Sequence, residues 1–170
     1  MTPPSFEQLL ELSRAVGQQL AASRQTIATA ESCTGGLIAS TLTDLAGSSD
    51  YVAGGVISYS NQVKQQLLGV RSDTLEKHGA VSPETAAEMA QGVRRLLQVD
   101  IGISATGIAG PGGACPDKPV GLVYLHLSAA GQEWGERHVW PYDRLGNKRA
   151  SVAATLTLAL RYLTDPTCRP

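Results

Sequence analysis

Three polar, Gly-rich segments constrain this chain most, because each directly follows a short run that predicts a β-strand. The segment ESCTGG follows 26–30, YSNQVK follows 52–58 and TGIAGPGG follows 101–105. In an open parallel α/β sheet, the loops at the carboxyl ends of the strands gather at one edge, where ligands bind. Three such segments in one small chain therefore predict one site at one edge of a sheet.

The remaining segments alternate between helical and strand patterns, which predicts a layered α/β domain with a largely parallel sheet. Apolar spacing and helix-start signals predict helices over 6–20, 37–45, 61–68, 83–98 and 144–163. The strand at 120–128 is apolar on both faces, so we expect it in the interior of the sheet. A short Ala-Gly turn joins it to a strand near 134–140, which predicts an antiparallel hairpin and makes the sheet mixed.

Length and charge place the chain among ordinary globular proteins. It has 170 residues, 42% of them hydrophobic and 17% charged, which fits one domain over 1–170 with a single sizeable core. The net charge of −1 gives no source for the counterion release that drives nucleic-acid binding, so no nucleic-acid partner is expected.

The chain carries no signal for export, membrane insertion or metal binding. Its N-terminus lacks a basic region followed by an apolar core, and its longest apolar stretch, 150–163, is shorter than the roughly 20 residues that span a bilayer. Cys33, Cys115 and Cys168 are odd in number and widely separated, which favours neither a disulfide framework nor a zinc site. We therefore expect a cytoplasmic protein with no metal, no cofactor and no membrane partner.

Ser32, in ESCTGG, is the candidate nucleophile. It lies where a strand turns into a helix, and the unpaired N–H groups and positive dipole end of a helix N-terminus stabilise an alkoxide or an oxyanion. The alternative interpretation is that Ser32 or Thr34 only caps the helix. Cys33 is a rival nucleophile, although a lone cysteine usually packs as a small buried hydrophobe.

Lys64, in YSNQVK, is the candidate base. A lysine that is partly desolvated in a cleft has a lowered pKa and can accept the serine proton; the alternative is a solvated lysine on a polar helix. The three histidines all lie outside the Gly-rich segments, and His126 falls in the middle of a strand. Tyr59 precedes Lys64 by five positions, so the Tyr-x-x-x-Lys pair of short-chain dehydrogenases is not matched.

The segment TGIAGPGG offers clustered backbone N–H groups, which are the raw material of an anion-binding nest. It lacks the Gly-Lys-Ser/Thr end of a P-loop, so it does not indicate a nucleoside triphosphate site, and a plain surface turn is the alternative. Asp143 and Arg144 similarly fit either a helix cap with a solvated arginine or a phosphate clamp.

Six motifs, taken together and in this order, resemble the CinA carboxy-terminal domain family, the nicotinamide mononucleotide deamidases or competence-damage-inducible domain proteins. They are AESCTGGLIASTLTDLAGSS, ISYSNQVKQQLLGV, HGAVS, SATGIAGPGG, KPVGLVY and YDR, and the resemblance runs over roughly 6–163. The resemblance implies a three-layer α/β/α fold, a stand-alone form of the domain and a homodimer. It also implies hydrolysis of nicotinamide mononucleotide to nicotinic acid mononucleotide and ammonia, in pyridine-nucleotide salvage, without a required metal.

The same resemblance implies roles for individual residues. Ser32 would be the nucleophile, Lys64 the general base and Tyr59 an aid to proton transfer or to the placing of Lys64. The residues implied to bind the nucleotide substrate are Thr34, Gly35, Thr106, Gly107 and Arg144. Of these, Thr106 and Gly107 would line the carboxamide pocket and Arg144 would approach the phosphate. Two other readings stay open: a non-catalytic nucleotide-binding or regulatory member, and a Ser-Lys amidase or esterase acting on another small substrate.

The chain departs from the family pattern on the phosphate side. Tyr142 stands where relatives often have Gly, Lys148 where a second Arg is usual, and Ala114 interrupts a common Gly run. These departures leave Ser32 and Lys64 intact, so we expect them to affect affinity more than chemistry.

Overall fold

The computed structural model of the protein describes residues 2–165 and 167, which form one α/β domain. The elements follow one another in the order α1 (Phe6–Ser23), β1 (Ile27–Glu31), α2 (Leu37–Thr43), a 3₁₀ turn η1 (Ser48–Asp50), β2 (Val52–Ile57), α3 (Asn61–Leu68), α4 (Ser72–His78), α5 (Pro83–Leu97), β3 (Ile101–Gly107), β4 (Leu122–Ala129), β5 (Gln132–Val139) and α6 (Arg144–Thr164). The helices and strands that the sequence predicts are all present, with ends that shift by a few residues.

Two elements differ from the prediction. The short helix α4 is missing from it, because Leu75 is its only apolar residue and gives no amphipathic pattern. It is supported instead by the ion pair of Arg71 with Glu88, which lies on α5. Strand β3 runs through Thr106 and Gly107, which were expected in a loop, because both residues still pair with β4.

The five strands form one mixed sheet in the order β2-β1-β3-β4-β5. Strand β1 pairs in parallel with β2 and with β3, while β4 pairs antiparallel with β3 and with β5. Four strands therefore run in one direction and β4 alone is reversed. This arrangement confirms the mixed sheet, the interior position of β4 and the hairpin of β4 with β5.

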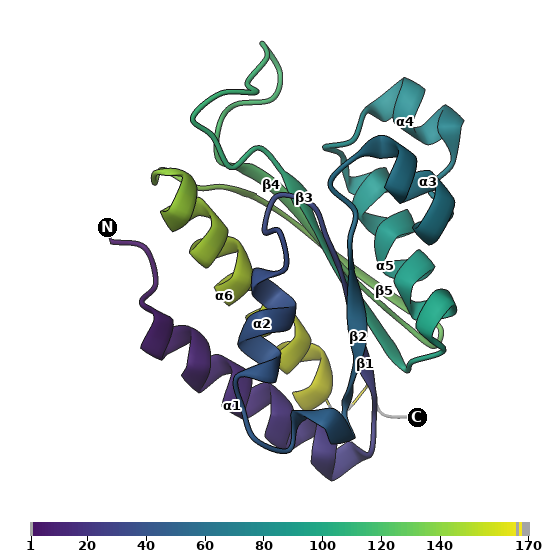
Figure 1. The fold of residues 1–170 in the computed structure, drawn as a ribbon, viewed down its shortest axis with the longest axis vertical. Helices are drawn as coiled ribbons and strands as arrows, with labels where there is room; N and C mark the ends of the chain where they lie inside the picture. The colour runs from purple at the N-terminus through teal and green to yellow at the C-terminus, as the bar shows by residue number, and fades with distance from the viewer. Residues whose placement is uncertain (1, 166, 168–170) are drawn as a thin grey trace.

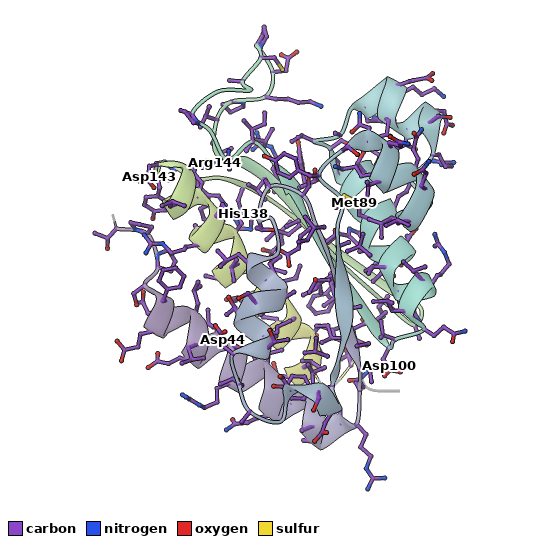
Figure 2. The ribbon with its side chains drawn as sticks, in the orientation of Figure 1. Asp44, Met89, Asp100, His138, Asp143 and Arg144 are labelled. Atoms are coloured by element: carbon purple, nitrogen blue, oxygen red, sulfur yellow. The ribbon has the colours of Figure 1, made fainter. Side chains whose placement is uncertain are left out.

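Helices cover both faces of the sheet and make three layers, as expected (Figure 1). Helices α1, α2 and α6 lie on one face, and α3, α4 and α5 lie on the other. Alternate residues of β1 enter the two cores: Ile27 packs with the α1/α2/α6 layer, while Ala28 and Ala30 pack with Met89 of α5. Figure 2 shows Met89 between α5 and the strands.

Helix α6 belongs to the core. Its buried apolar residues are Ala150, Val152, Leu156, Leu158, Ala159, Tyr162 and Leu163. The sequence left open whether this helix is a core helix or a subunit interface, and the structure places most of its apolar surface inside the domain. Of the helices in the described part of the chain, none is both long and apolar enough to cross a membrane.

The carboxyl ends of β1, β2 and β3 meet at one edge of the sheet. Glu31, the last residue of β1, pairs with Ile57 on one side and with Ala105 on the other. The next residues of the three strands, Ser32, Ser58 and Thr106, are therefore neighbours. Because β5 runs parallel to these strands, α6 begins at the same edge, and the long loop 108–121 projects there (Figure 1).

Candidate active site

Ser32 is fixed at this edge by backbone hydrogen bonds on both sides of it. Its N–H donates to the Ala105 carbonyl over 2.9 Å, and its own carbonyl accepts from the Gly35 N–H over 3.2 Å. The alternation of β1 turns the Ser32 side chain toward the α3/α5 layer, the same side as Ala28 and Ala30. Gly35 and Gly36 both have positive φ, which allows the tight turn into α2.

Glu31, the residue before Ser32, caps helix α2. Its carboxylate is buried and accepts hydrogen bonds from the N–H groups of Gly36, Ile38 and Ala39 at 2.8–3.1 Å. The sequence analysis expected the N-terminus of α2 to stabilise an alkoxide or an oxyanion. Its N–H groups instead bind the Glu31 carboxylate. Neither Ser32 nor Thr34 caps α2, so that alternative is wrong for both residues.

Lys64 reaches Ser32 from helix α3. The Lys64 side chain is only 1% exposed, and its Nζ lies 3.1 Å from Ser32 Oγ and 2.7 Å from the Ser58 carbonyl oxygen. Burial lowers the pKa of Lys64 below that of an ordinary lysine, and the nearby Cys33 thiol opposes this only in part. Among the described residues, no carboxylate forms an ion pair with Lys64. The prediction of a desolvated lysine next to the serine is thus met by the geometry.

Ser58 positions Lys64 and was not singled out from the sequence. Its N–H donates to the Glu31 carbonyl over 2.8 Å, which ties the end of β2 to the residue before Ser32. Its own carbonyl then accepts from Lys64. Since this contact uses a backbone oxygen, residue type gave no signal; only the place of Ser58 at the end of a strand could have indicated it.

Tyr59 and Arg144 contact each other at the mouth of the site. Arg144 donates to Tyr59 Oη over 3.1 Å and to the Gly110 carbonyl over 2.7 Å, so it joins the segment after β2 to the loop 108–121. Figure 2 shows Arg144 beside Asp143 at the start of α6. The Tyr59 side chain is 63% exposed, and its hydroxyl contacts Arg144, whereas the described partners of Lys64 are Ser32 and Ser58.

Thr106 and Gly107 form the floor of the site at the end of β3. Thr106 Oγ1 donates to the Ala80 carbonyl over 2.6 Å. Gly107 is packed so closely on β4 that a Cβ would lie 2.5 Å from the Leu122 carbonyl oxygen and 2.8 Å from Val123 Cα. Gly107 is thus required by strand packing, independently of any ligand.

The loop after β3 is held from outside by helix α6. The buried Asn147 donates to the Ala109 carbonyl over 3.0 Å and accepts from the Tyr142 N–H over 3.1 Å. Lys148, on the same helix, comes close to the turn into α2, because its Nζ would be 3.5 Å from a Cβ on Gly35. The sequence did not single out Asn147, because a lone amide in a helix carries no motif.

These groups surround a cavity of about 270 Å³. Its lining includes six of the eight predicted site residues: Ser32, Tyr59, Lys64, Thr106, Gly107 and Arg144. Thr34 and Gly35 are outside that lining. Thr34 is fully buried, and within the described chain its hydroxyl has no hydrogen-bond partner.

The alternatives to Ser32 and Lys64 as reactive groups are less well suited to that role. Cys33 also lines the cavity, but burial raises its pKa to about 12, so its thiolate is inaccessible near neutral pH. His126 contacts Glu133 across the β4–β5 pair, as expected for a cross-strand residue. In residues 2–165 and 167, no cluster of His, Cys, Asp or Glu could hold a metal ion.

Fold and site together define a three-layer α/β domain with a buried Ser–Lys pair at the carboxyl edge of its parallel strands. The chain belongs to the CinA C-terminal domain family, whose profile matches residues 9–163. This match confirms the resemblance seen in the sequence motifs.

Named relatives agree with that assignment. The chain is 52% identical over 153 residues to a CinA-like protein of Desulforapulum autotrophicum, covering 89% of this chain and 36% of that protein. It is 51% identical to a putative competence-damage inducible protein of Halothermothrix orenii, covering 87% of this chain and 35% of the relative. The chain thus spans little more than a third of the length of these curated relatives.

Solved structures match over nearly the whole chain. The competence/damage inducible protein CihA of Agrobacterium tumefaciens superposes with a TM-score of 0.90 at 37% identity, over 97% of this chain and 99% of that one. The competence damage-inducible protein A of Klebsiella pneumoniae also gives a TM-score of 0.90, at 32% identity, over 93% and 98% of the two chains.

Proposed function

We propose that this domain is an amidohydrolase that converts nicotinamide mononucleotide to nicotinic acid mononucleotide and ammonia, using Ser32 as nucleophile and Lys64 as base. The observation that carries the proposal is the buried Lys64 Nζ at 3.1 Å from Ser32 Oγ, with no carboxylate paired to it among the described residues. A lysine without a counter-ion in a buried position is readily neutral, and a neutral amine accepts a proton. A module that only binds nucleotides has no need of this pair.

The reaction runs through an acyl-enzyme. Ser32 Oγ passes its proton to Lys64 Nζ and bonds to the carboxamide carbon, and the carbonyl oxygen becomes an oxyanion. Lys64 then gives the proton to the amide nitrogen, the C–N bond breaks and ammonia leaves. Water next attacks the ester, Lys64 takes a proton from the water, and that proton returns to Ser32 Oγ as the acid is released.

The oxyanion needs hydrogen-bond donors other than those at the start of α2, because the N–H groups of Gly36, Ile38 and Ala39 already donate to the Glu31 carboxylate. The donors nearest to Ser32 along the chain are the N–H groups of Cys33 and Thr34. Arg144, which also lines the cavity, suits the phosphate, because a guanidinium binds phosphate through paired hydrogen bonds.

Release of ammonia from a panel of small amides tests the proposal. We expect nicotinamide mononucleotide to be hydrolysed and the Ser32→Ala protein to be inactive toward it. Turnover of another amide in its place would support a Ser-Lys amidase with a different substrate. Tight binding of the nucleotide without ammonia release would instead support a regulatory module.

A further inference from the structure

Lys118 joins the long loop after β3 to the C-terminal end of α4. Its Nζ donates to the His78 carbonyl oxygen over 2.6 Å. His78 is the last residue of α4, and the final carbonyls of a helix have no partner within the helix. A lysine ammonium at this place satisfies one of them and interacts favourably with the negative end of the helix dipole. Gly79 leaves room for the contact, because a Cβ there would lie 3.1 Å from Lys118 Nζ.

The tip of this loop, residues 111–118, depends on that one bond. Within the tip, the backbones of Cys115 and Lys118 exchange two hydrogen bonds of 3.0 Å across a tight turn. Of the hydrogen bonds and ion pairs in the described chain, only that of Lys118 with His78 joins the tip to another element. Because Cys115 holds the backbone of Lys118, the contact of the Lys118 side chain determines where the tip lies.

The two segments that Lys118 joins both line the cavity. Residues 112–113 belong to the loop tip, and residues 80–81 directly follow the end of α4. Packing does not hold the loop segment tightly, because a Cβ on Gly112 would meet nothing within 4 Å. Figure 1 shows the loop and α4 at the same end of the molecule. The bond made by Lys118 therefore keeps one wall of the cavity in place relative to another.

This contact gives a role to two motifs that the sequence analysis left without one. His78 is the first residue of HGAVS, and Lys118 is the first residue of KPVGLVY. Arg144 holds the same loop from the side of α6, through the Gly110 carbonyl. The loop is thus attached near its start to α6 and at its tip to α4.

We infer that Lys118 is a positioning residue that fixes the loop wall of the cavity for binding of the nucleotide. The inference rests on the proposed function, which names the nucleotide as the occupant. Lys118 is not among the residues that line the cavity, so it acts through the loop rather than on the ligand. A wall that is already ordered loses less conformational freedom when a ligand binds, which strengthens binding. The reaction at Ser32 and Lys64 does not use this bond.

Amide exchange and steady-state kinetics on the full chain test this role. Lys118→Met keeps the length of the side chain and removes the donor. We expect the amides of residues 115 and 118, followed by NMR, to exchange about tenfold faster in this variant, because the loop tip opens more often. KM for nicotinamide mononucleotide should rise by about tenfold while kcat changes little. Lys118→Arg keeps a charged donor and should restore both values.

Lys77→Met is the matched control, because it removes a positive charge from the exposed neighbouring position on α4. Both its exchange rates and its KM should equal those of the parent protein. An equal rise of KM in this control would show that charge alone attracts the substrate, which overturns the inference. Unchanged exchange in Lys118→Met, or faster exchange with the parent KM, overturns it as well. If the parent protein does not hydrolyse nicotinamide mononucleotide, the proposed function fails, and the exchange rates alone decide whether Lys118 holds the loop.

Discussion

Lys64 Nζ lies between Ser32 Oγ at 3.1 Å and the Ser58 carbonyl oxygen at 2.7 Å. A neutral amine has two N–H groups and one lone pair. When one N–H is directed to Ser58, the lone pair can face Ser32 and accept its proton. The backbone of Ser58 therefore orients Lys64, and burial favours its neutral form.

The first prediction concerns the pH dependence of catalysis. Lys64 must be neutral to accept the Ser32 proton, and burial lowers its pKa from the ordinary value of 10.5. We expect kcat/KM for nicotinamide mononucleotide to increase with pH along a single limb whose midpoint lies below 10.5. Kinetics at neutral and alkaline pH measure this, and a midpoint at the value of an exposed lysine would contradict Lys64 as the base.

The second prediction concerns the coupling of Ser32 and Lys64. Ser32→Ala and Lys64→Ala should each lower kcat by about a thousandfold or more, with the fold retained, and the double variant should be little worse than either. Ser58→Ala is the control, because it keeps the backbone carbonyl that contacts Lys64 and should keep most activity. Additive losses would show that the two residues act independently, and full activity of Ser32→Ala would point to Cys33.

The third prediction concerns stability. Because the pKa of Lys64 is lower in the folded than in the unfolded protein, the unfolded chain binds more protons between the two pKa values. The free energy of unfolding should thus rise with pH across that window, by at most about 1.4 kcal/mol per pH unit. Lys64→Met should lack this rise, whereas Lys77→Met, at an exposed site on α4, should keep it. Urea unfolding at several pH values measures the difference, and parallel curves for all three proteins would refute the argument.

The fourth prediction concerns Arg144. Arg144→Ala should raise KM for nicotinamide mononucleotide by about ten- to hundredfold and change kcat much less, because its expected ligand is the phosphate. Nicotinamide riboside, which lacks the phosphate, should be a poor substrate and suffer little further loss. Leu145→Ala, at the adjacent exposed position, is the control. Equal penalties with and without the phosphate would exclude the clamp and leave Arg144 a role in holding Tyr59 and Gly110.

The fifth prediction separates packing from ligand binding in the Gly-rich loop. Gly107→Ala should destabilise the protein strongly, because its Cβ would overlap the backbone of β4. Gly112→Ala should have little effect on stability, because Gly112 lines the same cavity and a Cβ there meets nothing within 4 Å. Thermal unfolding of both variants checks this, and similar losses of Tm would argue against the packing role.

Local patterns in the sequence predicted most of the fold and the polar edge of the sheet. Short β-branched runs followed by Gly-rich segments indicate strands that end in loops, and the register of β1 then places Ser32 beside Thr106. The sequence did not predict the extension of β3 to Gly107, because pairing with β4 determines it. It also did not predict the short helix α4, which an ion pair supports rather than local propensity.

The contacts that complete the site could not be read from the sequence. Glu31 caps α2 across a turn, Ser58 orients Lys64 through its backbone, and Asn147 holds Ala109 from 38 positions away in the chain. None of these roles depends on a short motif, because each requires two segments to be brought together by the sheet. The sequence could name Ser32 and Lys64 as candidates, but only the fold shows that they touch.

The reversed direction of β4 has a consequence for how the family can diversify. If β4 were parallel to β3, the chain would need a crossover connection, and only the first short turn of that crossover would lie at the edge that carries Ser32. With β4 antiparallel, the whole connection 108–121 stays at the edge that carries Ser32, joined to the body by Arg144 and Asn147. Insertions and deletions there can alter which ligands enter while strand register and the Ser–Lys pair remain untouched, so the shape of the cavity mouth can evolve separately from that pair.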